Sequence, residues 1–255
     1  MLYNWNFLAK QRKIYLVDHA SKIEGEFRNI VGDVAIKALG HIDNSSHPWH
    51  QFCQHIISAS IVDPFDPSAI GFYSQASQFL FFYSEYYSDV QKQQAIKRIL
   101  SKSKANSLIF EHLIGMNYIW SNFYQVIPTN INVANHDFIL KAEEISVGVE
   151  CSVRYERFDD DYLIEKMKRK AKQLDTSIPN ILAIHIPNIR YEELFSGTMT
   201  QEDFEKRVFN KLKKYNSTST ISMVLFSADD MINLGFYNPY ALNKIPSHFP
   251  ISPGP

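Results

Sequence analysis

The stretch Ser146-Val147-Gly148-Val149-Glu150-Cys151-Ser152-Val153 alternates strictly between an apolar series and a small or polar series. Such alternation is typical of a β-strand, because successive side chains point to opposite faces of a sheet. One face of this strand is therefore formed by the valines and Cys151, and the other face carries Glu150. A carboxylate inside an otherwise apolar strand needs a partner or a metal ion to be tolerated.

On both sides of this strand the pattern alternates between helix and strand. The elements we expect are helices over 108–120, 160–174 and 201–214, and strands over 123–127, 136–140, 180–186 and 221–226. The resulting order, α-β-β-β-α-β-α-β, predicts an α/β fold with a mixed sheet that helices cover on both faces.

The first hundred residues show helical spacing instead, which predicts a helical N-terminal domain over 1–104 and an α/β domain over 105–255. A helix predicted over 67–90 is rich in Phe and Tyr. Stacking of these rings on bases is one interpretation, but packing against other helices explains their distribution around the helix better. The basic cluster that follows, interleaved with serine and asparagine, favours a solvated linker; its members are Lys97, Arg98, Lys102 and Lys104.

The composition limits the class of protein. The 255 residues hold 26 Lys and Arg against 27 Asp and Glu, so the formal net charge is -1, which excludes a binder of nucleic acid that relies on overall charge. With 45% hydrophobic residues the chain can bury a core. No apolar run approaches the roughly 20 residues that span a bilayer, and the first residues lack a signal-peptide pattern. Two cysteines, Cys53 and Cys151, favour a reducing, cytoplasmic location.

Three carboxylates form a candidate metal site. Asp137 and Glu150 lie on neighbouring predicted strands and can converge on one side of the sheet, and Glu111 lies on the preceding helix. Mg²⁺ takes oxygen ligands and is often held by few carboxylates together with water and substrate phosphate. We therefore expect Mg²⁺ or Mn²⁺ as cofactor, bound by Asp137, Glu150 and Glu111. Cys151 belongs to the valine face, so we interpret it as a buried structural thiol.

Three segments carry a resemblance to a known family: Phe110-Glu111-His112-Leu113-Ile114, Asn135-His136-Asp137-Phe138 and Val147-Gly148-Val149-Glu150-Cys151-Ser152. Together they resemble the PD-(D/E)XK nuclease superfamily, whose restriction-endonuclease-like core runs αβββαβ and carries a helical Glu, an Asp at the second strand and Glu-X-Lys in the third. The helix and strand over 166–187 are similar to those that follow in the family. The resemblance covers roughly residues 105 to 240 and implies a metal-dependent nuclease.

The chain departs from the family at the motif lysine, which is replaced by Ser152. A serine cannot supply positive charge. Arg154, two residues further on the same face, can supply charge but not base chemistry, because a guanidinium does not deprotonate. The other source is the basic helix that follows, since members of the superfamily relocate the lysine there. We expect Lys172 or Lys168, which share a helix face, to act in its place.

Arg154 and the remaining cations of that helix, Lys166, Arg169 and Lys170, are candidates for contact with the phosphate backbone. The resemblance thus implies hydrolysis of phosphodiester bonds, with DNA favoured over RNA, and a helical domain for target recognition or dimerisation. The alternative is a nuclease fold that has lost catalysis and acts as a module that binds nucleic acid or protein. Ser152 favours this alternative, and a solvated helix face is the simpler interpretation of the basic run.

Overall fold

The computed structural model describes residues 80–120, 125–129, 136–153, 160–185, 219–227 and 233–245, together with Gly25, Asn29, Asp203, Lys206 and Asn210. The chain divides into two compact units, Met1–Leu113 and Ile114–Pro255. The division falls inside a helix, nine residues after the predicted domain boundary at 104 (113 − 104 = 9). Within the described part of the chain, no helix is both long enough and apolar enough to cross a membrane.

In the first unit, the described helix that begins at Leu80 ends before Tyr87 and Ser88. Ser88 then caps helix α5 (Asp89–Ile99): its hydroxyl accepts from the backbone N–H of Gln91, whose side chain in turn bonds the backbone N–H of Ser88. The single helix predicted over 67–90 is therefore wrong at its end, because this capping box starts a new helix at Asp89.

The aromatic residues of this region pack against one another. Phe82 is buried, and its ring stacks on Tyr86 with ring centroids 5.3 Å apart. The edge of the His112 ring lies against Phe82 at 4.9 Å and against Tyr87 at 5.1 Å. These contacts favour the packing interpretation of the described aromatic residues over a platform for bases.

Helix α6 (Lys102–Trp120) spans the boundary between the units. The basic cluster predicted as a linker is helical, since Lys97 and Arg98 lie in the last turn of α5 and Lys102 and Lys104 open α6. In the second unit the end of α6 packs on the sheet through Tyr118, whose ring centroid lies 6.4 Å from that of Phe138.

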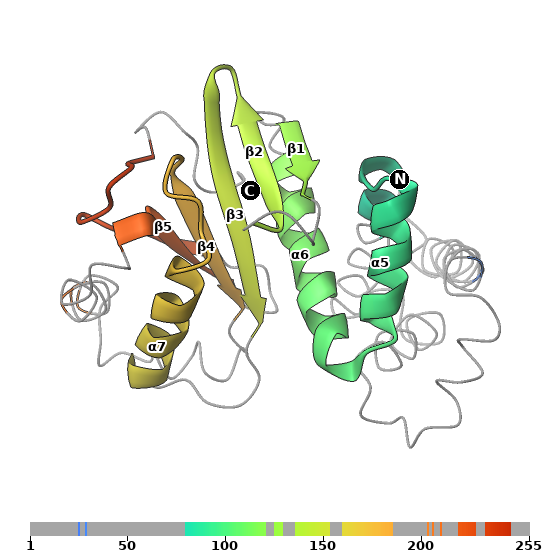
Figure 1. Cartoon of the computed structure of the whole chain (residues 1–255), viewed down its shortest axis with the longest axis horizontal. Helices are drawn as coiled ribbons and strands as arrows, with labels where there is room; N and C mark the ends of the chain where they lie inside the picture. The colour runs from blue at the N-terminus through green and yellow to red at the C-terminus, as the bar shows by residue number, and fades with distance from the viewer. Residues whose placement is uncertain are drawn as a thin grey trace, which may run out of the picture. The chain divides into compact units, whose positions relative to one another are not determined.

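The second unit is built on a six-stranded mixed sheet whose strands lie in the same order as in the chain (Figure 1). The strands are β1 (Gln125–Pro128), β2 (Phe138–Ala142), β3 (Ile145–Val153), β4 (Asn180–His185), β5 (Met223–Ser227) and β6 (Asn233–Tyr237). Strands β1, β2 and β3 are antiparallel, β3, β4 and β5 are parallel, and β6 is antiparallel to β5. The predicted mixed α/β fold is confirmed.

Helix α7 (Asp160–Ala171) connects β3 to β4 and covers one face of the sheet. Its buried residues share a core cluster with alternate residues of β4 and β5; the members are Leu163, Ile164, Met167, Ala171, Leu174, Leu182, Ile184, Ile221, Val224 and Phe226. The register pairs Glu150 with Leu182 and Ser152 with Ile184, so Glu150 and Ser152 lie on the face that α7 covers. The opposite face carries Val149, Cys151 and Phe138, on which α6 packs.

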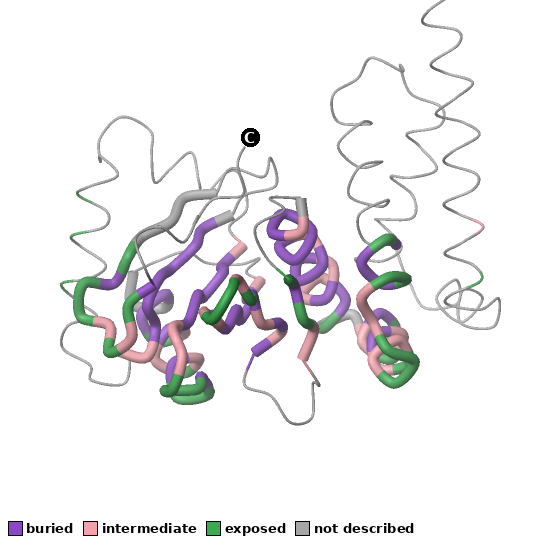
Figure 2. Tube along the Cα trace, turned by 90° about the horizontal axis from the view of Figure 1, so that it is seen from above, coloured by how far each residue is buried: buried purple, intermediate pink, exposed green. Residues whose placement is uncertain are grey.

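Two strands differ from what the sequence pattern predicts. Six consecutive residues of β3, Val147 to Ser152, are buried (Figure 2), although their polarity alternates, because helices cover both faces. Strand β6 was not predicted, since Asn233-Leu-Gly-Phe-Tyr237 lacks strict alternation and contains a glycine. The helix predicted over 201–214 lies mostly outside the described residues.

Candidate active site

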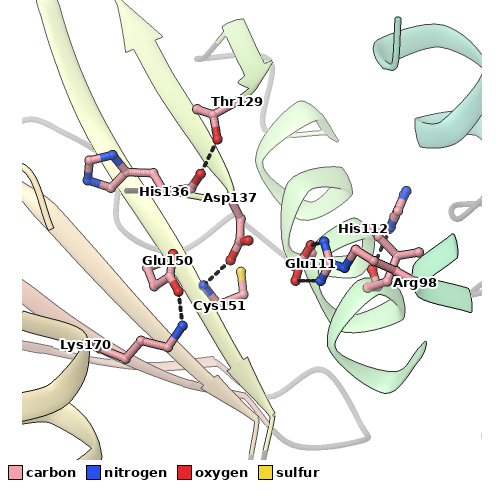
Figure 3. Close-up of polar contacts among 10 residues, drawn as sticks. Arg98, Glu111, His112, Thr129, His136, Asp137, Glu150, Cys151 and Lys170 are labelled. Atoms are coloured by element: carbon pink, nitrogen blue, oxygen red, sulfur yellow. Dashed lines mark hydrogen bonds and ion pairs between the residues drawn. The ribbon is translucent and has the colours of Figure 1, made fainter. Parts of the chain in front are cut away.

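Glu150 and Lys170 form an ion pair at the centre of the sheet. Glu150 is 9% exposed in the middle of β3, where an ionised carboxylate is costly to bury without a partner. Lys170, in the last turn of α7, reaches down to it and donates from Nζ to Oε1 (Figure 3). Burial alone would lower the pKa of Lys170, but the Glu150 carboxylate, its hydrogen bond and the nearby Asp137 raise the pKa above its ordinary value. The lysine is therefore held as an ammonium ion between two carboxylates.

Asp137 lies immediately before β2, and its neighbours on both sides fix it. Its backbone N–H donates to Val149 over 2.9 Å, and its carbonyl accepts from Thr129 over 3.1 Å. The carboxylate oxygen Oδ2 accepts from the backbone N–H of Cys151 at 2.7 Å. Figure 3 shows the Asp137 carboxylate at the same stretch of β3 as Glu150. The expectation that these two carboxylates meet on adjacent strands agrees with this geometry.

Ser152, at the position of the family's lysine, is 3% exposed and lies under α7. Among the described residues its hydroxyl has no hydrogen-bond partner. A lysine at this position would have to extend beneath α7 into the core cluster. The serine therefore suits a strand that a helix covers closely, and the positive charge beside Glu150 comes from the helix instead.

The structure brings Lys170 to Glu150, rather than Lys168 or Lys172. Lys168 pairs with Glu165 over 2.5 Å on an exposed side of α7. Lys172 is exposed and follows the last residue of the helix. Both predicted substitutes are thus placed elsewhere, because the sheet-facing side of α7 is set by Leu163 and Met167.

A signal for Lys170 exists in the sequence. It lies three residues after Met167 and seven after Leu163, the spacing of one helix face, and Ala171 and Leu174 continue the same buried side. The lysine that shares the apolar face is the one that can reach the sheet. The other predicted phosphate contacts, Lys166 and Arg169, lie on α7 with partly or fully exposed side chains. Arg154 lies outside the described residues.

Glu111 has a charged partner within the first unit. It belongs to the first unit and is 5% exposed. Arg98 binds it with two nitrogens: Nη1 donates to Oε2 at 2.6 Å and Nη2 donates to Oε1. The guanidinium engages both carboxylate oxygens, so Glu111 is the partner of Arg98 in this structure. Its role as a metal ligand stays a prediction.

The donor set can be compared with the needs of a divalent cation. Among the described residues no group of three His, Cys, Asp or Glu side chains gathers as for a metal site. Two carboxylates remain, Asp137 and Glu150. This set fits Mg²⁺ or Mn²⁺, because such an ion keeps several waters and takes only one or two carboxylates together with substrate phosphate. It does not fit a closed site made only of protein ligands. Cys151 is buried on the opposite face, as predicted.

His136, which the sequence did not single out, is a further buried polar residue of this site. Its Nε2 lies 2.6 Å from Oδ1 of Asn180 in β4. Burial lowers the pKa of His136, and the contacts with Asn180 and Asp175 offset this only in part. The imidazole next to Asp137 is therefore neutral near pH 7. No spacing in the sequence joins residues 136 and 180, since they meet only through the order of the strands.

Comparison of the chain with protein-family models, with curated proteins and with solved structures finds no match. The site therefore has to be interpreted from its own residues.

Proposed function

We propose that the chain is a metal-dependent nuclease with a restriction-endonuclease-like core, which hydrolyses phosphodiester bonds in DNA. The observation that carries this proposal is the ion pair between Lys170 and Glu150 beside Asp137. An aspartate at the second strand, a glutamate in the third and a lysine are the parts that the resemblance calls for. The lysine comes from the following helix, at a position that the sequence pattern alone did not select.

The order of elements supports the same proposal. Helix α6, strands β1 to β3, helix α7 and strand β4 follow one another as αβββαβ, with an antiparallel β1–β2–β3 meander and β4 parallel to β3. In this arrangement the start of β2 and the centre of β3 lie side by side, which brings Asp137 to Glu150.

In this proposal the residues of the site have different roles. Asp137 and Glu150 would hold the cation, which when bound supplies positive charge for the phosphoryl oxygens and acidifies water. Lys170 can stabilise negative charge that develops on the phosphate, because its ammonium contacts Glu150 and interacts with the charge of Asp137. The exposed Arg169 and the half-buried Lys166 lie on the same helix and can contact the flanking phosphates.

Cleavage of plasmid and linear DNA by the full chain, with Mg²⁺ or Mn²⁺, tests the proposal. The variants are Asp137→Asn and Lys170→Met, with Lys172→Met as the matched control, because Lys172 is an exposed lysine two residues away. We expect cleavage to fall by more than about 100-fold in the first two and to stay near wild type in the control. Cleavage that survives Asp137→Asn in folded protein would rule out the assignment.

A second function, a binding module that has lost catalysis, is favoured by Ser152 at the motif position. In that case the Lys170–Glu150 pair serves only to neutralise a buried carboxylate. Calorimetric titration of the full chain with Mn²⁺ separates the two functions. A saturable site that Glu150→Gln removes supports the nuclease, and the absence of such a site leaves the binding role.

A further inference from the structure

The side chain of His136 reaches from the start of β2 across β3 to β4. This path exists because residue 148, between them in β3, is a glycine. A Cβ on Gly148 would collide with Cδ2 and Nε2 of the His136 ring and would lie 2.7 Å from Oδ1 of Asn180. The imidazole therefore fills the space that a side chain of β3 would otherwise occupy, and it joins two strands that are not neighbours in the sheet.

The surroundings of Asn180 orient its side-chain amide for a hydrogen bond with this ring. It is fully buried, and its Nδ2 faces three backbone carbonyls, those of Asp175 at 2.6 Å, Ile178 at 2.9 Å and Thr220 at 3.0 Å. The amide nitrogen must point at these acceptors, so Oδ1 must point at the imidazole. Because Oδ1 can only accept, His136 Nε2 carries the proton and donates over the 2.6 Å contact.

The backbone of the same residue is held on the other side. The carbonyl of His136 accepts from the Thr129 hydroxyl at the end of β1, and the backbone of Asp137 bonds to Thr129 and Val149. The start of β2 is thus held on two sides. The His136 ring bonds it to Asn180 in β4, and the His136 carbonyl bonds it to Thr129, which follows β1. Between these two anchors lies the Asp137 carboxylate, with its bond to the Cys151 N–H.

We propose that His136 is a positioning residue, which through Asn180 holds the start of β2 so that the Asp137 carboxylate stays beside Glu150 for cation binding. This inference rests on the proposed function and adds to it a residue outside the family's motif. In this proposal His136 acts through its bond to Asn180 and not as a ligand of the cation. Removal of this bond frees the strand start and misplaces Asp137 without changing either carboxylate.

The test compares Mn²⁺ affinity, measured by calorimetry on the full chain, in wild type, His136→Leu and His136→Gln. A glutamine amide can donate to Oδ1 of Asn180 from nearly the place of Nε2, so we expect it to retain affinity within about threefold. Leucine cannot donate, and we expect a loss of roughly 10–100-fold, the usual effect of removing a group that orients a ligand.

Asn238→Ala serves as the structural control, because Asn238 is also buried and its side chain bonds the Ile221 carbonyl at 2.8 Å and the Tyr240 N–H at 3.0 Å. It should lower stability and leave Mn²⁺ affinity unchanged. If wild type shows no saturable Mn²⁺ binding, the proposed function fails. If wild type binds and His136→Leu binds equally well, or Asn238→Ala loses as much, the positioning role alone fails.

A second measurement needs no variant. Long-range ¹H–¹⁵N spectra of the wild-type chain report which imidazole nitrogen carries the proton. We expect the Nε2–H tautomer for His136 at pH 7. Observation of the Nδ1–H tautomer would show that His136 does not donate to Asn180 and would overturn the positioning role.

Discussion

Two buried ion pairs in the described part of the chain show different chemistry. In the first unit Arg98 binds Glu111 through two nitrogens, one to each carboxylate oxygen. In the second unit Lys170 contacts one carboxylate oxygen of Glu150, and the charge of Asp137 also raises the pKa of Lys170. A bidentate guanidinium saturates its carboxylate, whereas an ammonium is a point charge on a flexible stem. Buried charge alone therefore does not mark a functional site; a second carboxylate and a movable partner do.

The largest expected effect concerns the pair that we regard as structural. Arg98→Met leaves the Glu111 carboxylate buried without its guanidinium, since the two side chains are only 16% and 6% exposed. We expect a loss of about 3–5 kcal/mol in the free energy of unfolding, measured by urea denaturation. Addition of Mn²⁺ should not restore this loss. Recovery with Mn²⁺ would mean that Glu111 binds the cation after all.

The pair in the second unit should respond differently. Lys170→Met removes the cation beside Glu150, with side chains 21% and 11% exposed, and we expect a smaller loss of about 2–3 kcal/mol. Here Mn²⁺ should raise the unfolding midpoint more than in wild type, because binding to the folded state adds stability and no ammonium competes for Glu150.

The neighbouring pair between Lys168 and Glu165 provides the control for this variant. Glu165 is 69% exposed, so Glu165→Ala should cost at most about 0.5 kcal/mol and should not alter the response to Mn²⁺. An equal Mn²⁺ response in Lys170→Met and wild type would contradict the idea that lysine and cation share Glu150.

Low pH should reduce the free energy of unfolding through His112, the residue that follows Glu111. Burial lowers the pKa of His112 to about 3, the backbone bond to Leu108 raises it in part, and Arg98 lowers it further. Below the ordinary pKa of about 6.5 the unfolded chain binds a proton that the folded chain does not. This contribution to stability is complete above pH 6.5 and is lost as the pH falls toward 3, at up to about 1.4 kcal/mol per pH unit.

We therefore expect a loss of about 2 kcal/mol from this histidine between pH 7 and pH 5, measured as the change in unfolding free energy. His112→Gln should reduce the slope without abolishing it, because burial also lowers the pKa of His136. A slope that His112→Gln leaves unchanged would show that His112 does not carry the effect.

Apart from the control Glu165→Ala, the smallest effect is expected at Ser152. Its buried hydroxyl has no hydrogen-bond partner among the described residues, so Ser152→Ala should change stability by no more than about 1 kcal/mol, in either direction. Cleavage should also persist, because the charge comes from Lys170. A strong loss of cleavage at normal stability would show that the hydroxyl contacts substrate or water in the reaction.

The sequence predicted the strands β2 and β3 that lie next to Asp137 and Glu150, because alternation and element order depend on local pattern. It did not select Lys170, since the helix predicted over 160–174 carries five cations, and only the buried side defined by Leu163 and Met167 decides among them. It could not find the bond between His136 and Asn180, because that contact depends on a missing side chain at Gly148. It also could not find Arg98 as the partner of Glu111, because the two residues lie in different helices.

The strand order has a consequence for how the chain acquires its structure. Because every strand pairs with the strands before and after it in the sequence, each new strand meets an edge that already exists when it leaves the ribosome. The sheet can therefore grow from β1 toward β6 without inserting a late strand between earlier ones, which keeps the pairing contacts between adjacent elements of the chain. The start of β2 and the centre of β3 form early in this order, whereas the two partners that come from beyond β3, Lys170 and Asn180, arrive later.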